Sequence, residues 1–198
     1  MRTILVFFAA VFLLACSGER KETTKKPAIQ YTPSKNISEL LNDYKEVELN
    51  ADLSKLSSDQ KKLIAILIEA SDIMDELFWL QTYGDKSELL DNISDSACRA
   101  YAEINYGPWD RLNADLSFIN EIGEKPKGAN FYPMDMSEEE FNALEDSSKT
   151  DLYTLIKRDE EGALYTIPYH EAYREKLSQA SDLLKKGAEL AEDSGLKN

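Results

Sequence analysis

Apolar residues recur at helical spacing through most of the chain that follows residue 36. The first stripe consists of Ile37, Leu40, Leu41, Tyr44 and Val47, which would share one face of a helix. A stronger apolar pattern follows SSDQ at 57–60, a capping-box sequence typical of a helix start, and Gly84 supplies a stop. This second segment is apolar around much of its circumference, so we expect it to lie at the centre of the fold.

A long loop region interrupts the helical pattern. A third helix is expected to begin at Ser87 and to end at Gly107, and the stretch 108–136 that follows is rich in Gly and Pro. The sequence SEEE at 137–140 is another capping box, and its carboxylates suit the first turn of a helix. We therefore expect helices on both sides of the loops.

Two short runs of β-branched and aromatic residues within 152–167 flank a charged turn that contains Gly162, which predicts a β-hairpin. The last helix is expected from about Tyr169 to Glu192. The sequence therefore predicts an α+β fold that is mostly α-helical. Its helices would pack around one core over residues 37–198, with a single hairpin.

The N-terminus has a different pattern, in which Arg2 precedes an unbroken apolar run over residues 4–15. As a helix this run would rise about 18 Å, well short of the roughly 30 Å of a bilayer core. We therefore expect residues 1–15 to be a signal peptide and not a membrane span. The sequence LLAC at 13–16 resembles the lipobox of bacterial lipoproteins, which implies acylation of Cys16. The alternative is an ordinary signal peptide whose cysteine is incidental.

A lipidated Cys16 would place the protein in the bacterial cell envelope, anchored to the lipid bilayer and facing the periplasm. The polar residues 16–36, which include Pro27 and Pro33, are then expected to form a flexible tether. The chain has 23 Lys and Arg against 37 Asp and Glu, a net charge of −14. Because such a surface repels phosphate groups, we expect no nucleic-acid partner.

This sequence offers few candidate residues for catalysis or for metal binding. The chain has one histidine, His170, and positions 174 and 175 are Arg and Glu where a zinc-binding helix would need a second histidine. We expect His170 at the surface or at a helix end. Cys98 lies among small residues and is expected to be a buried small hydrophobe. The sequence therefore assigns no catalytic residue and no metal ligand.

Aromatic residues in the loop region are the more specific candidates. Trp109, Phe131 and Tyr132 lie beside Gly and Pro residues that fix turns. Their rings either hold the loops on the core or form a binding surface for a peptide or protein partner.

The same loops carry a family resemblance. YGPWDR at 106–111, KGANFYP at 127–133, and the hairpin followed by HEAY at 170–173 resemble the dipeptidyl peptidase III family of zinc peptidases, in its bacterial lipoprotein branch. The resemblance extends from about Leu40 to the C-terminus. It implies a two-lobed, much longer enzyme in which zinc is held by an H-E-x-x-x-H motif that this sequence lacks.

The resemblance thus implies a truncated chain: the N-terminal, non-catalytic segment of a lipid-anchored dipeptidyl peptidase III-like enzyme. This segment would help to shape the substrate cleft and would be inactive alone, with zinc held by a missing C-terminal lobe. That lobe would be its partner, and a separate chain could supply it. The alternative is a stand-alone envelope lipoprotein that binds a peptide or protein through the aromatic loops.

Overall fold

The structure is a computed structural model that describes residues 29–198. The signal peptide predicted over 1–15, the lipidation site predicted at Cys16 and the first part of the predicted tether lie outside the described residues. Among the residues that are described, no helix is both long and apolar enough to cross a membrane.

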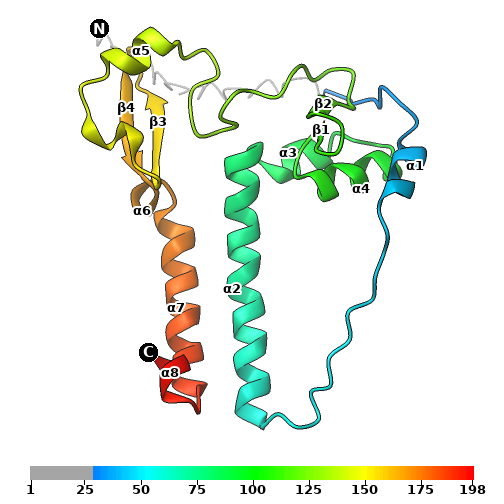
Figure 1. The fold of residues 1–198 in the computed structure, drawn as a ribbon, viewed down its shortest axis with the longest axis vertical. Coiled ribbons are helices and arrows are strands. Elements are labelled where there is room, and N and C mark those ends of the chain that lie inside the picture. The colour runs from blue at the N-terminus through cyan, green and yellow to red at the C-terminus, as the bar shows by residue number, and fades with distance from the viewer. Residues whose placement is uncertain (1–28) are drawn as a thin grey trace, which may run out of the picture.

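The predicted α+β, mostly helical fold is confirmed (Figure 1). The helices are α1 (Ile37–Leu40), α2 (Ser58–Thr82), α3 (Lys86–Leu90), α4 (Ser96–Asn105), α5 (Glu138–Ala143), α6 (Tyr169–Ala172), α7 (Arg174–Leu190) and α8 (Ser194–Lys197), with 3-10 turns at Leu41–Asp43 and Ser147–Thr150. Two antiparallel hairpins pair β1 (Trp109–Asp110) with β2 (Leu116–Ser117), and β3 (Thr154–Arg158) with β4 (Leu164–Pro168). The second pair is the predicted hairpin, and the first was missed because its strands are only two residues long.

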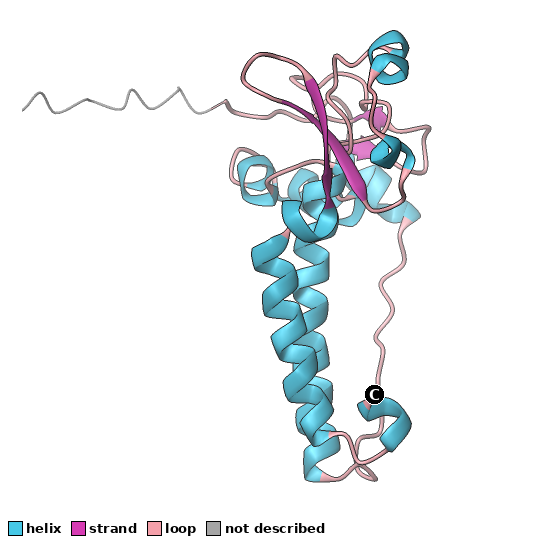
Figure 2. Ribbon diagram, turned by 90° about the vertical axis from the view of Figure 1, so that its left-hand side faces the viewer, coloured by secondary structure: helices cyan, strands magenta, loops and turns pink. Residues whose placement is uncertain are grey.

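The elements form an arm and two bodies at one end of it (Figures 1 and 2). The arm consists of α2 and α7, which lie antiparallel and pack along their lengths. At the C-terminal end of α2 lies the head, which we define as α1, α3, α4 and the β1–β2 hairpin. At the N-terminal end of α7 lies the β3–β4 hairpin with α5. Residues 120–136 connect these two bodies across the top of the arm (Figure 1).

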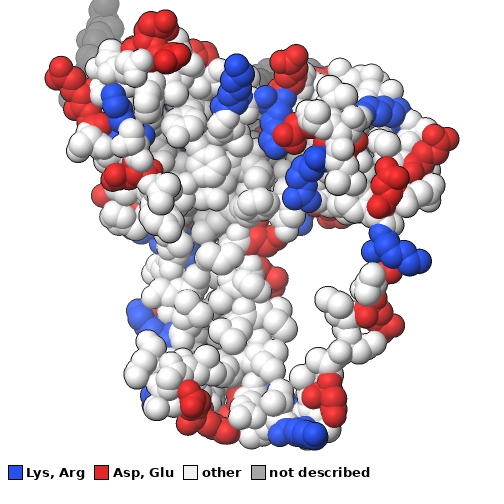
Figure 3. All heavy atoms as spheres, viewed as in Figure 1, with Lys and Arg blue, Asp and Glu red and all other residues white. Residues whose placement is uncertain are grey.

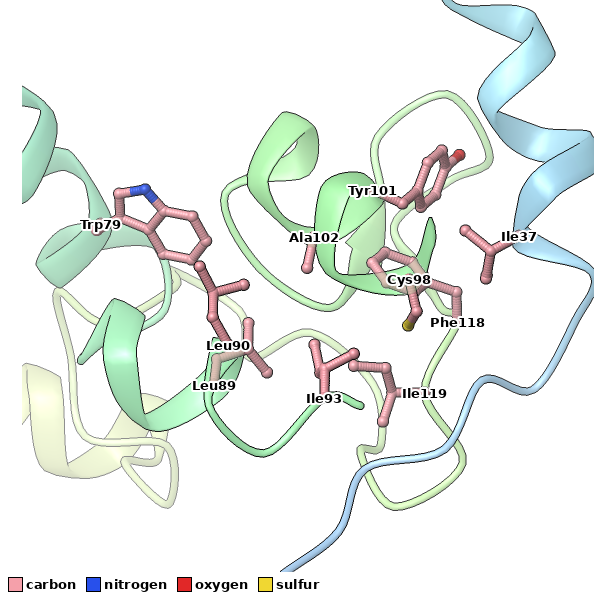
Figure 4. Packing of buried hydrophobic residues seen from close by; sticks show 10 residues of the cluster. All are labelled: Ile37, Trp79, Leu89, Leu90, Ile93, Cys98, Tyr101, Ala102, Phe118 and Ile119. Carbon is pink, nitrogen blue, oxygen red and sulfur yellow. The ribbon is translucent and has the colours of Figure 1, made fainter. Parts of the chain in front are cut away.

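The main core lies in the head (Figure 4). Its buried members are Ile37, Trp79, Leu89, Leu90, Ile93, Cys98, Tyr101, Ala102, Phe118 and Ile119. The rings of Tyr101 and Phe118 meet edge to face with their centroids 4.8 Å apart, a geometry that aromatic pairs prefer. Trp79 joins this core from the last turns of α2, so the core fixes the head to the arm.

The expected central position of α2 is only partly right. Its N-terminal capping box forms as predicted, because Ser57 and Gln60 each accept the other's backbone N–H. One face buries Leu63, Ala70 and Leu77. The apolar residues Leu67, Ile68, Met74 and Phe78 are nevertheless 41–57% exposed. A second apolar face of α2 is therefore uncovered in this structure.

Three predicted helices are shorter or broken. The first ends at Asp43, and Val47 is 67% exposed in an extended segment, because the stripe meets no surface there. The third divides into α3 and α4, since Asp85 and Asp95 each accept backbone N–H groups as N-caps. The last divides at Tyr173, whose φ of −116° and ψ of 25° leave the helical region.

The domain begins before Ile37, within the stretch predicted as tether. The Tyr31 N–H donates to the Asn92 carbonyl at 2.8 Å, and the Ser34 N–H donates to the Phe118 carbonyl at 2.9 Å. These bonds fix residues 31–34 to the head, so the expected flexible tether is wrong for this part.

An ion pair ties α5 to the β3–β4 hairpin. The Arg158 guanidinium donates to both carboxylate oxygens of Glu140 at 3.0 Å, and Glu140 also accepts the Ser137 N–H of the predicted capping box. Such bidentate pairs are the stronger kind of charged hydrogen bond. The guanidinium and the capping bond lower the pKa of Glu140 from 4.5 to about 2.

We expect Glu140→Gln to destabilise the protein in a pH-dependent way. A carboxyl whose pKa is lowered by folding contributes stability above its unfolded pKa and loses it as pH falls from 4.5 toward 2. The difference in free energy of unfolding between wild type and Glu140→Gln, measured with urea, should shrink across that window. Glu139→Gln in the same helical turn is the control, and an equal difference at all pH values would contradict the prediction.

Candidate functional site

The aromatic residues predicted from the loops do not form one surface. Trp109 and Tyr132 both line a cavity of about 620 Å³ near the last turn of α2. Phe131 lies outside this cavity, where its ring stacks on Tyr169 with centroids 6.3 Å apart. The structure therefore brings two of the three predicted rings together and directs the third toward α6.

Trp109 is held by the turn that ends α4. Tyr106 has a φ of 53° and Gly107 a φ of 149°, so the chain reverses within two residues. The indole N–H of Trp109 donates to the Gly123 carbonyl at 2.9 Å, and the residue is only 7% exposed. Trp109 therefore anchors its loop and offers only a small part of its ring to the cavity.

Tyr132 is positioned by a glycine. Gly128 has a φ of 77°, and a Cβ at that position would lie 2.4 Å from a ring carbon of Tyr132. Only a residue without a side chain lets the ring lie this close to the backbone. The same loop is fastened to α2, because the Asn130 side chain donates to the Leu80 carbonyl at 2.7 Å.

Lys157 of β3 reaches the cavity from the hairpin. Its ammonium donates to the Asn130 carbonyl at 3.1 Å, and burial lowers its pKa. Three carboxylates, those of Asp85, Glu88 and Glu124, also line the cavity. All three residues are exposed, and the Asp85 carboxylate also caps α3 by accepting two backbone N–H groups.

Sequence reasoning missed three further lining residues. Tyr31 was assigned to the tether, Tyr83 to the end of a helix and Lys157 to a hairpin. Burial raises the pKa of Tyr83, so its hydroxyl stays protonated. These residues are far apart in the chain, and no local pattern could have joined them.

Nucleophilic and metal chemistry find no support here. The side chain of His170 is 77% exposed, and its Nε2 lies 3.8 Å from the Glu171 carboxylate. Cys98 is buried as expected, and burial raises the pKa of its thiol to about 11, which disfavours the reactive thiolate. Within residues 29–198, no three His, Cys, Asp or Glu side chains lie together as a metal site. The described residues therefore do not fit a zinc ion.

No family model matches the chain. Two solved structures share its fold. DPP III from Caldithrix abyssi matches 81% of the chain with a TM-score of 0.74 and 39% sequence identity. Dipeptidyl-peptidase III from Corallococcus sp. strain EGB matches 81% with a TM-score of 0.73 and 29% identity. The resemblance to dipeptidyl peptidase III is confirmed.

The resemblance is to a part of these proteins. The chain spans 32% of each dipeptidyl peptidase III structure, about a third of its length. A curated protein named Nudix hydrolase 3, from Arabidopsis thaliana, is 28% identical in an alignment that spans 226 residues and covers 83% of this chain and 29% of that protein.

We expect Gly128→Ala to destabilise the protein by about 1–2 kcal/mol from backbone strain alone, and by more because the new methyl group displaces Tyr132. Gly162→Ala is a matched control, since Gly162 has a φ of 87° and open space around it. Chemical denaturation should show a larger loss for Gly128→Ala. In a Tyr132→Ala background the two losses should become similar, and unequal losses there would contradict the explanation.

Proposed function

We propose that this chain is the non-catalytic segment of a lipid-anchored, dipeptidyl peptidase III-like zinc peptidase of the bacterial cell envelope. The shared fold with two dipeptidyl peptidase III structures carries the proposal. In this proposal the segment helps to shape the cleft for a peptide substrate. The zinc ion and the groups that activate water come from the part of the enzyme to which this chain has no counterpart.

The uncovered apolar face of the arm supports the proposal that a partner lobe is missing. Leu67 and Met74 of α2 lie beside Leu184 of α7 and Leu196 of α8, around an apolar hollow of about 620 Å³. Figure 3 shows that much of the arm surface in this view carries no charged residue. Contiguous apolar surface of this kind marks an interaction site. The remaining part of a complete peptidase would cover it.

A complementation experiment tests the segment proposal. The remainder of Caldithrix abyssi DPP III, without its matching third, would be co-produced with residues 16–198 of this chain, and separately with its own missing third as positive control. We expect each pair to copurify and to release dipeptides in a zinc-dependent manner, and this chain alone to release none.

Variants locate the contact in that experiment. Leu67→Lys and Leu184→Lys place a charge on the exposed arm face and should reduce copurification at least tenfold, because a buried unpaired charge costs several kcal/mol. Leu152→Lys, at a site that is 85% exposed near β3, should leave copurification unchanged. Dipeptide release by this chain alone, or assembly of the positive control without assembly of the hybrid, would overturn the proposal.

The lipid anchor has its own test. The LLAC sequence at 13–16 supports acylation of Cys16. We expect the protein produced in a bacterial host to partition into the detergent phase of Triton X-114 and to carry a lipid on its N-terminal residue by mass spectrometry. Cys16→Ser should move it to the aqueous phase, whereas Cys98→Ala should not. Unlipidated wild-type protein would disprove the anchor.

A further inference from the structure

A cavity beside the last turn of α2 is lined entirely by residues of this chain. Its volume of about 620 Å³ falls within the range of roughly 300–1,000 Å³ that ligand pockets occupy. Aromatic and proline side chains from separate segments form much of its wall: Tyr31, Tyr83, Trp109, Tyr132, Pro126 and Pro133. An aromatic groove of this kind is suited to extended peptides, because proline rings stack on aromatic side chains.

The charged residues around the cavity indicate whether it favours a positively or a negatively charged ligand. Three carboxylates line it, and Lys157 is the one cation among its described lining residues. Asp85 serves as the cap of α3, but Glu88 and Glu124 are exposed and have no ion-pair partner within residues 29–198. The chain as a whole carries a charge of −14. A positively charged ligand is therefore favoured over an anionic one.

Lys157 supplies hydrogen-bond donors within the same cavity. An ammonium group has three N–H donors, and the Asn130 carbonyl accepts one of them at 3.1 Å. The remaining donors suit the carbonyl oxygens of a peptide backbone, which an extended polyproline-type segment leaves free. Such a segment is ordered before binding and therefore loses little conformational entropy.

We propose that this cavity binds an extended, proline-containing peptide segment that carries a lysine beside its prolines. The proline rings contact Tyr132 and Tyr83, the lysine ammonium pairs with Glu88 and Glu124, and Lys157 donates to a backbone carbonyl oxygen. This site goes beyond the proposed peptidase role, because it needs no zinc lobe and lies entirely within this chain.

Isothermal titration of the purified chain with acetyl-Pro-Pro-Lys-Pro-Pro-amide tests the proposal. We expect a dissociation constant in the range of about 10 µM to 1 mM. Replacing the lysine of the peptide with glutamate, or its prolines with alanine, should weaken binding at least tenfold. Equal binding of the three peptides, or no saturable binding of the first, would overturn the proposal.

Variants of the chain separate the two parts of the site. Tyr132→Ala should weaken binding of the lysine peptide about tenfold through lost ring contact. The double variant Glu88→Gln/Glu124→Gln leaves the aromatic rings in place. It should bind the lysine peptide several-fold more weakly, and its affinity should depend less on salt concentration than that of the wild type. Tyr165→Ala, an exposed ring on β4 outside the cavity, is the control. The melting temperature of the Glu88/Glu124 double variant shows whether it is still folded. If it melts at the wild-type temperature and binds the lysine peptide with unchanged affinity, the proposed site is wrong.

These measurements use this chain alone and no peptidase assay. Loss of peptide binding would therefore leave the complementation experiment unaffected, and failed complementation would leave the cavity intact.

Discussion

The end of α2 is the constraint on which the arrangement depends. The last carbonyl groups of any helix lack partners within the helix and must find them elsewhere. Here the Trp79 carbonyl accepts the N–H groups of Tyr83 and Gly84, while the Leu80 and Gln81 carbonyls accept the side-chain and backbone N–H groups of Asn130. One helix end is thus bonded both to its own exit turn and to the distant 126–133 loop.

Aromatic contacts at the end of α2 also join the head to the arm. The Trp79 ring is buried in the head core and lies against Tyr106, with ring centroids 5.3 Å apart. The Thr82 hydroxyl lies 2.9 Å from the Phe78 carbonyl oxygen of its own helix and 3.2 Å from the Tyr106 carbonyl oxygen, so it can donate to either. The 126–133 loop is also bonded to β3, because the Ile156 N–H donates to the Phe131 carbonyl at 3.0 Å. Head, arm and hairpin are therefore joined through a few residues, and the cavity lies where they meet.

Two surfaces follow from this arrangement, and they differ in kind. The cavity is concave, carries both rings and charges, and is built from segments that fix one another. The exposed face of α2 and α7 is apolar, and among the described residues no further element covers it, whereas an apolar helix stripe is normally buried against another element. The first has the features of a ligand site and the second those of an internal interface, which is why a binding role and a segment role are compatible in one chain.

Local sequence rules predicted much of the fold. The capping boxes at Ser57 and Ser137 form as expected, since they depend on residues three positions apart. The hairpin with its turn at Gly162 also forms, because strand propensity and a turn residue coincide there. The break between α3 and α4 was missed, although Asp95 is a strong cap, because the apolar spacing continues through it.

The sequence by itself determined the capped helix starts at Ser57 and Ser137, the β3–β4 hairpin, the acidic charge and the lack of histidines for a zinc site, since these depend on neighbouring residues or on composition. Only the tertiary structure decided which apolar stripes are covered. It left Leu67 exposed, and it brought Tyr31, Trp109 and Tyr132 to one cavity. The reason is physical: burial depends on which segments meet across the fold, and periodicity within one segment carries no information about its partner.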